Sequence, residues 1–178
     1  MRQSFDYLVV CSQEEISEEV VSYFHPYLAD LYRAHLPLMP RGLSPAALRR
    51  GLHDLAREVR ANRQSALAGR VLDTAWSGGQ ASLGLGKAIE AANAQAVDVL
   101  VVAGWYAKPG VVCSSCGALG RTGDQCHVCG EKTFHVDDVV SELMDAVVDA
   151  GGTVHQIEVA SPLDSDGVGA LTRYPVKV

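Results

Sequence analysis

Four of the five cysteines fall in two close pairs, and their spacing limits the fold of this chain more than any other feature. The pairs are Cys113-x2-Cys116 and Cys126-x2-Cys129, with nine residues between them. Each Cys-x2-Cys turn presents two sulfurs on one side, and nine residues allow the second turn to fold against the first. Four thiolates complete the tetrahedral coordination of Zn²⁺ and leave no position for a substrate, so the spacing predicts a structural zinc site.

The residues between these ligands cannot form a core of their own. Leu119 and Val128 are the only large aliphatic side chains there. Zinc in a small site of this type contributes on the order of 10 kcal/mol to local folding, so we expect a zinc-binding insertion at 110–132 that unfolds locally without the metal. The alternatives are four free thiols or two disulfides. His127 could replace a cysteine, but its place between Cys126 and Cys129 favours exposure to solvent.

Composition and charge exclude several classes of protein. Hydrophobic residues make up 48% of the chain and charged residues 20%, which allows a sizeable core. The net charge of −6 opposes broad, nonspecific binding to nucleic acid, although it permits a local basic patch. No secretory signal precedes the cysteines, and the longest apolar stretch, residues 99–107, is far shorter than the ~20 residues of a membrane span. We therefore expect a cytoplasmic protein with no membrane partner.

A glycine-rich stretch at residues 77–86 separates two parts of the chain. In the first part, Ser44-Pro45 predicts the start of a long helix that extends toward Ala75 with a break near Asn62. The lone Cys11 ends an apolar strand and is expected in the core. The other elements expected here are strands at 5–11 and 33–39 and a helix that begins at 13 after Ser12 as its cap.

Helices and strands alternate in the second part, which favours a mixed or parallel sheet covered by helices. Asp137 is expected to cap a helix whose buried side includes Leu143 and Val147, and Gly151-Gly152 to end it. The full set of elements expected here is a helix at 85–94, a strand at 97–102, the cysteine segment, a helix at 137–150 and a strand at 153–159.

The second part resembles a known family. The order of its motifs is similar to that of the third, C-terminal domain of the eukaryotic and archaeal class 1 peptide chain release factor. Bacterial relatives of that factor and Pelota-type ribosome rescue proteins share this domain. In archaeal members a zinc-bearing insertion follows the first strand, as the cysteines do here. The segments that carry the resemblance are Gly79 to Gly84 with Ala88 and Ala91, Val97 to Val102, Asp138 to Gly151, Val154 to Val159, and Gly167 to Tyr174.

The resemblance implies a fold and a function. Residues 77–178 are expected to form a three-layer α/β/α sandwich of the kink-turn-binding ribosomal protein type, with the zinc insertion at 110–132. Residues 1–76 resemble the back half of the family's middle domain, a partial RNase H-like unit. The decoding domain and the front of the middle domain have no counterpart, which favours a fragment of a longer factor. The resemblance implies a translation-associated interaction module that docks on the ribosome or a translational GTPase. Whether this chain alone is an enzyme stays open at this point, and the absence of activity is favoured.

Gly78-Gly79-Gln80 spells the tripeptide with which release factors hydrolyse peptidyl-tRNA. The family's tripeptide lies in a basic loop of its middle domain, but the nearest basic residues here are Arg70 and Lys87. We therefore assign no catalytic residue and keep a peptidyl-tRNA hydrolysing release or rescue factor using Gln80 as the alternative. A phosphate-binding P-loop ending at Lys87 is excluded, because positions 81 and 88 are both alanine.

Overall fold

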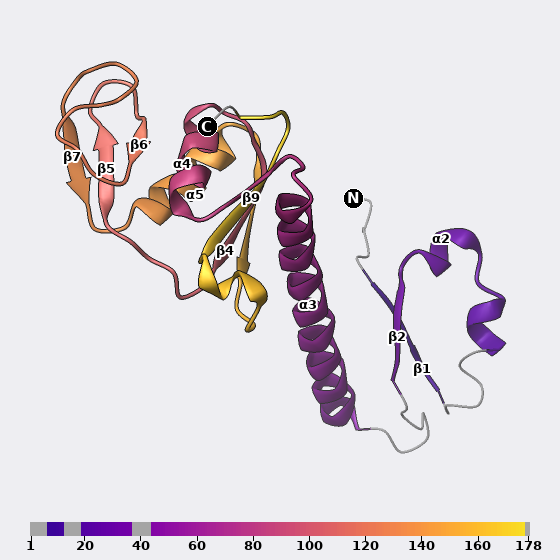
Figure 1. The fold of residues 1–178 in the computed structure, drawn as a ribbon. Helices are drawn as coiled ribbons and strands as arrows, with labels where there is room; N and C mark the ends of the chain where they lie inside the picture. The colour runs from indigo at the N-terminus through magenta and orange to yellow at the C-terminus, as the bar shows by residue number, and fades with distance from the viewer. Residues whose placement is uncertain (1–6, 13–18, 37–43, 177–178) are drawn as a thin grey trace. The chain divides into compact units, whose positions relative to one another are not determined.

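The structure is a computed structural model that describes residues 7–12, 19–36 and 44–176 (Figure 1). It divides into two compact units, Met1–Asn62 and Arg63–Val178. Both units contain helices and strands, so the predicted mixed α/β class is confirmed. No helix within these described ranges is long and apolar enough to cross a membrane. The domain boundary expected at residue 77 remains a prediction.

The first unit contains two parallel strands, β1 (Leu8–Cys11) and β2 (Tyr32–Leu36), with the short helix α2 (Pro26–Ala29) between them in sequence. Both expected strands are present, although the ends at 5–6 and 37–39 lie outside the described residues, as does the helix start at 13. Cys11 is exposed, which corrects the expected core position. It is the last residue of β1, where the partly buried pattern of the strand ends.

The long helix α3 (Pro45–Trp76) is continuous over 32 residues, so the break expected near Asn62 is wrong. The helix begins where the sequence predicts, because the Ala47 amide donates to Ser44 Oγ at 3.2 Å. Beyond Asn62 the helix is held by tertiary burial in the second unit, which outweighs the weak helix propensity of asparagine. Its buried residues there are Ala68, Val71 and Leu72.

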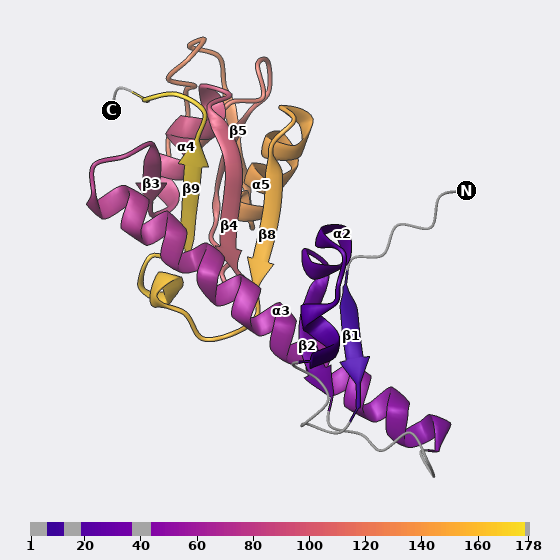
Figure 2. The ribbon, with the colours of Figure 1, turned by 90° about the vertical axis from the view of Figure 1, so that its right-hand side faces the viewer.

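A four-stranded sheet with the order β3-β9-β4-β8 forms the centre of the second unit (Figure 2). β4 (Val97–Ala103) pairs parallel with β8 (Thr153–Ile157) and antiparallel with β9 (Val168–Thr172). β9 in turn pairs antiparallel with β3 (Ala81–Leu83). Four consecutive residues at the end of β4 are buried, which is typical of a central strand covered on both faces.

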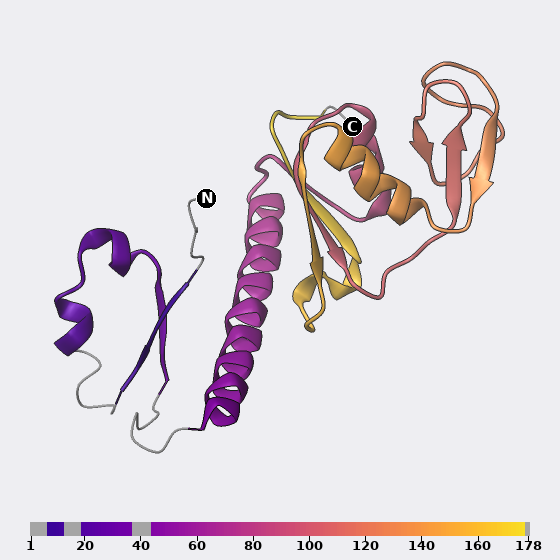
Figure 3. The same ribbon diagram turned by 180° about the vertical axis from the view of Figure 1, so that it is seen from behind.

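Helices lie on either side of this sheet (Figure 3), and each face carries its own hydrophobic cluster. Leu100 and Val102 of β4 pack among residues of α4 (Leu85–Asn93) and α5 (Val139–Asp149). Val101, between them in sequence, packs with residues of α3. Alternate residues of a strand point to opposite faces, so β4 contributes to both clusters. In the second unit, helices therefore cover the sheet on both sides.

The start of α5 corrects one detail of the sequence analysis. Asp138, not Asp137, is the N-cap: its Oδ1 accepts from the Val140 amide at 3.0 Å and its Oδ2 accepts from Ser141 Oγ at 2.9 Å. Both aspartates suit a helix start, and only the backbone geometry selects between neighbours. At the other end, Gly151 has φ +76°, a left-handed conformation that ends the helix as expected.

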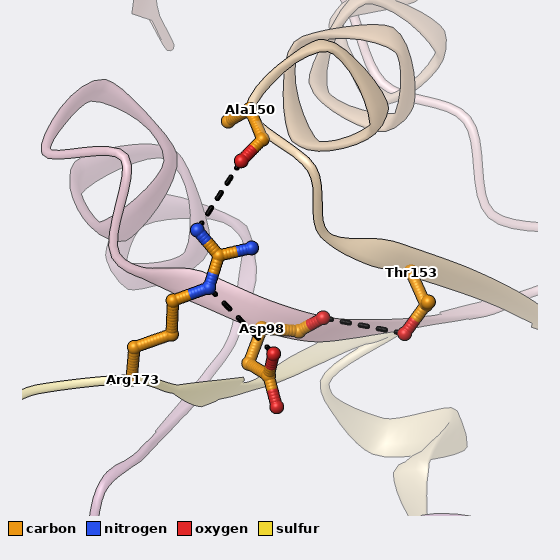
Figure 4. A network of polar contacts seen from close by, with 4 residues as sticks. All are labelled: Asp98, Ala150, Thr153 and Arg173. Atoms are coloured by element: carbon orange, nitrogen blue, oxygen red, sulfur yellow. Dashed lines mark hydrogen bonds and ion pairs between the residues drawn. The ribbon is translucent and has the colours of Figure 1, made fainter.

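Arg173 and Tyr174 hydrogen-bond to the carboxyl ends of two helices, and Figure 4 shows the contacts of Arg173. Arg173 Nη1 donates to the Ala150 carbonyl at 3.2 Å, at the end of α5, and its Nε lies 3.6 Å from Asp98 Oδ1. The Tyr174 hydroxyl donates to the Ala94 carbonyl at 2.6 Å, at the end of α4. A cation beside a helix C-terminus is favourable, because the carbonyls there carry partial negative charge. This pair therefore fastens both helices to the end of β9.

We predict that Gly169→Ala destabilises the second unit. A Cβ at Gly169 would lie 2.7 Å from Val71 Cγ1 and 3.0 Å from Leu163 Cδ1, both in the core between β9 and α3. Overpacking of this kind lowers the free energy of unfolding by about 1–3 kcal/mol. Urea denaturation followed by circular dichroism measures the change.

The matched control is Gly69→Ala. Gly69 lies inside α3, and no atom comes within 4 Å of a Cβ added there. This substitution should raise the free energy of unfolding by roughly 0.5–1 kcal/mol, because glycine is a poor helix former. Equal effects of the two substitutions would contradict the packing described for β9.

Candidate metal centre

A three-stranded antiparallel sheet with the order β6-β5-β7 carries the cysteines. Its strands are β5 (Gly110–Cys113), β6 (Leu119–Gly120) and β7 (Thr133–Val136), which lie between β4 and α5 in the sequence (Figure 1). We call residues 110–136 the ribbon. Its centre, β5, is buried along its whole length, although the loops around it are mostly exposed.

The ribbon brings all four predicted ligands together. Their four sulfur atoms lie within 4.8 Å of one another, and all four cysteines are free thiols. The Sγ atoms of Cys113 and Cys129 are 3.4 Å apart, and those of Cys116 and Cys126 are 3.6 Å apart. A tetrahedron with Zn–S bonds of ~2.3 Å has edges of about 3.8 Å. The donor set and its spacing therefore fit a zinc ion, and exposed His127 is not part of the cluster.

The two Cys-x2-Cys turns have the same local structure. Gly117 and Gly130, which directly follow the second cysteine of each pair, have φ +72° and +79°. Each donates its amide to the carbonyl of the first cysteine in its pair, at 3.2 Å to Cys113 and 2.9 Å to Cys126. Only glycine adopts this conformation at little cost, so the sequence Cys-Gly at these positions closes both turns.

Backbone amides point at the first sulfur of each turn. The amides of Cys116 and Ser115 donate to Cys113 Sγ at 3.5 and 3.4 Å and lower the pKa of this thiol to about 6. In the second turn, the amides of Cys129 and Val128 lower the pKa of Cys126. Hydrogen bonds to a charged sulfur favour the thiolate, which is the form that binds metal.

The second sulfur of each turn is affected in the opposite direction. The Glu131 amide acts to lower the pKa of Cys129, but the neighbouring sulfurs of Cys113 and Cys116 outweigh it and raise this pKa to about 12. The pKa of Cys116 is also raised, although the Ala118 amide acts to lower it. Four sulfurs this close cannot all ionise without a cation, so a metal ion would displace protons from Cys116 and Cys129.

The ribbon is joined to the core of the second unit by contacts that the sequence analysis missed. Leu119 is only 3% exposed and belongs to the cluster formed by α4, α5 and β4. Asn93, at the end of α4, clamps the same residue: its Nδ2 donates to the Leu119 carbonyl at 2.8 Å, and its Oδ1 accepts from the Leu119 amide at 2.9 Å. These partners are 26 residues apart, so no local pattern could indicate them.

The Gly78-Gly79-Gln80 tripeptide forms the turn between α3 and β3. The Gly79 amide donates to the Thr74 carbonyl at 2.8 Å, and a Cβ at Gly79 would lie 2.8 Å from Thr74 Cγ2. Gln80 is exposed, and its carbonyl accepts from the Thr172 amide at 2.9 Å. In the amide orientation that satisfies its neighbours, its side-chain nitrogen donates to the carbonyls of Thr172 and Arg173, each at 3.1 Å.

No protein-family model and no curated protein matches this chain. Solved structures do. Pelota from Archaeoglobus fulgidus is 22% identical, with a TM-score of 0.52 over 98% of this chain and 51% of its own. Dom34 from S. cerevisiae is 14% identical, with a TM-score of 0.54 over 97% of this chain and 48% of its own. Archaeal Pelota in a ribosome-bound structure with ABCE1 is 18% identical, with a TM-score of 0.55 over 97% of this chain and 44% of its own.

These likenesses show the fold of this chain. Its fold is similar to that of the Pelota and Dom34 structures over 97–98% of the chain. The predicted resemblance to this group of proteins is thereby confirmed at the level of the fold. The chain spans about half the length of the solved structures that it matches.

We predict one zinc ion per chain, held by the four clustered cysteines. Cys116→Ser should release the metal into a chelator, because the oxygen is a much weaker zinc ligand than the thiolate it replaces. Cys11→Ser is the matched control, since this exposed cysteine lies outside the cluster and should leave the zinc content unchanged. Elemental analysis gives the stoichiometry, and absence of metal from freshly purified wild-type protein would contradict the site.

Asn93→Ala should loosen the ribbon without removing its ligands. The substitution leaves the Leu119 amide and carbonyl without their partner in a part-buried site, which costs about 1–3 kcal/mol. Hydrogen exchange should show faster exchange at the Leu119 amide. The control is Asn62→Ala, on an exposed position of α3. Unchanged exchange at Leu119 in the Asn93 variant would show that the clamp does not hold the ribbon.

Proposed function

We propose that this chain is a translation-associated, release-factor-like interaction module that docks on the ribosome or a translational GTPase. The observation that carries this proposal is its likeness in fold to Pelota and Dom34 over 97–98% of its length. One of these structures is of ribosome-bound Pelota with ABCE1, and Dom34 is described as a translation termination-like factor that interacts with Hbs1. The proposal includes a cytoplasmic location, which a ribosomal role supports.

The fold suits this role in its details. Residues 77–178 correspond, in our proposal, to a sandwich of the kink-turn-binding ribosomal protein type, used mainly for protein contacts. Helices on both faces of the central sheet support this assignment. Residues 1–76 would be a partial RNase H-like unit, for which the parallel pair β1–β2 followed by a long helix is the supporting feature.

The zinc ion would shape a docking tip and would perform no chemistry. Four cysteines complete its coordination, so no ligand position is left for a substrate. Two large apolar side chains on the ribbon are exposed: Val128 is 60% exposed and Phe134 on β7 is 50% exposed. Exposed apolar side chains on a metal-stiffened loop support a protein-contact surface.

Hydrolysis of peptidyl-tRNA through Gln80 has less support. A water-positioning glutamine needs a free side-chain amide, but this amide bonds to the chain's own backbone at Thr172 and Arg173. Close packing of Gly79 against Thr74 also limits the mobility of the tripeptide. We therefore propose no catalytic role for Gln80.

Ribosome pelleting tests the proposed docking. The chain should co-sediment with ribosomes or with a ribosome–GTPase complex. Phe134→Ala should keep its zinc and lose several-fold in ribosome affinity, because it removes an exposed apolar contact from the ribbon. Cys11→Ser, on an exposed position outside the ribbon, should pellet like the wild type. If the wild-type chain pellets with neither, the proposed function is wrong.

Peptide release from ribosome complexes tests the hydrolytic alternative. We expect no release by the chain, and no difference between wild type and Gln80→Ala. Release that this substitution abolishes would reverse the preference between the two functions.

A further inference from the structure

A groove of about 700 Å³ lies where the first turn of α4 meets the ribbon and the loop between β4 and β5. Three cationic side chains line it, each from a different segment: Lys87 from α4, Lys108 from the β4–β5 loop, and Arg121 from the ribbon. Tyr106 and Asp166 also line it. The groove contains neither the clustered cysteines nor Gln80, so the proposed metal site and the tripeptide do not account for it.

The charge of this groove is positive although the chain as a whole is acidic. Among the residues that the structure describes, none of the three cations forms an ion pair; the ion pairs found there join Arg57 to Asp54 and Arg173 to Asp98. Asp166 is the one acidic residue among the described lining, and its carboxylate accepts from Ser165 Oγ at 3.2 Å. Three positive charges against one negative charge favour an anionic ligand.

Neighbouring residues restrict the positions of two of these cationic residues, Arg121 and Lys108. A Cβ at Gly86 would lie 3.6 Å from Arg121 Cδ, so the arginine stem lies along the first turn of α4. The Lys108 carbonyl accepts from the Val139 amide at 2.8 Å, which fixes the loop at the start of α5. Lys108 Nζ lies 5.6 Å from the centre of the Tyr106 ring, within cation–π range. A prearranged site loses little entropy when it binds a ligand.

An exposed tryptophan stands beside the groove. Trp105 is 65% exposed, and its ring meets that of Tyr106 edge to face, with centroids 5.8 Å apart and planes 74° apart. Tyr106 is itself held close over Gly167, where a Cβ would clash with its ring. The indole therefore has a fixed support and solvent-exposed area. Exposed aromatic rings beside cations are the usual platform for unpaired bases and their phosphates.

We propose that this groove binds an unpaired segment of RNA. Lys87, Lys108 and Arg121 hold its phosphates, and one base stacks on Trp105. An acidic peptide would satisfy the three cations but would give the indole no planar partner. This inference adds an RNA contact to the proposed docking on the ribosome. Its biological role rests on that proposed function. It also agrees with an acidic chain that binds nucleic acid at one local site only.

Salt dependence measures the phosphate contacts. Fluorescence anisotropy with the zinc-loaded chain and a labelled eight-nucleotide oligoadenylate should show a log–log salt slope of about −2 for three contacts to single-stranded RNA. Affinity should then fall roughly twentyfold between 50 and 200 mM salt. Arg121→Gln should weaken binding and reduce the slope by about 0.7. Arg70→Gln, on an exposed position of α3 outside the groove, is the matched control and should change neither.

Tryptophan fluorescence measures the stacking directly. The chain has two tryptophans, so Trp76→Phe leaves Trp105 as the sole indole. Oligoadenylate should quench its emission, and Trp105→Ala should weaken binding about tenfold or more. Trp76→Ala removes an indole that is 73% exposed and outside the groove, and should have no effect. Polyglutamate should not quench Trp105, and it should compete with RNA much more weakly than oligoadenylate does, because it can occupy the cations but cannot stack on the indole.

Each failure has a distinct signature. If polyglutamate displaces RNA and the Trp105 emission does not respond to oligoadenylate, the groove is a peptide site and the inference is wrong. If the chain pellets with ribosomes but binds no oligoadenylate, the groove proposal fails and the docking proposal stands. If oligoadenylate quenches Trp105 but the chain does not pellet with ribosomes or with a ribosome–GTPase complex, the RNA site stands and the docking proposal fails.

Discussion

Burial of β4 on both faces is the constraint on which the second unit depends. Leu100 and Val102 anchor the cluster beneath α4 and α5, whereas Val101 anchors the cluster beneath α3. The same strand is hydrogen-bonded to β8 on one side and β9 on the other. β4 is covered by side chains on both faces and paired with a strand on both edges. The segment that follows it therefore continues beyond the end of the strand, away from the sheet. The ribbon, the basic groove and Trp105 all belong to or adjoin that segment.

The cysteine cluster is connected to this core by packing and hydrogen bonds. Leu119 lies between the two Cys-x2-Cys turns, yet its side chain is buried with α4 and α5. Asn93 holds its backbone from the end of α4. The metal would thus fix the outer loops, while the apolar cluster and the amide clamp fix the inner strands. Arg121 lies two residues after Leu119, so its position depends on the metal site and on the apolar cluster with the amide clamp.

Local signals predicted much of the structure from the sequence. The cysteine spacing, the Ser44-Pro45 helix start and the apolar run of β4 are each contained in one short stretch of sequence, and the structure contains all three. The features that the sequence did not predict correctly depend on partners distant in sequence or on a choice between adjacent residues. Continuity of α3 depends on burial in the second unit, and the Asn93 clamp on a residue 26 positions away. The groove gathers residues from 83 to 166, so composition alone could not show it.

The position of β9 has a consequence for the order in which the protein is made. β9 is the last strand in the chain, yet it lies between β3 and β4 in the sheet. During synthesis, β3 and β4 therefore leave the exit tunnel before β9. Until β9 follows, the strand edges that pair with it have no hydrogen-bonding partner. Such long-range pairing is slow and leaves apolar surface exposed while it is incomplete. Chaperone protection of the nascent chain would matter most in that interval.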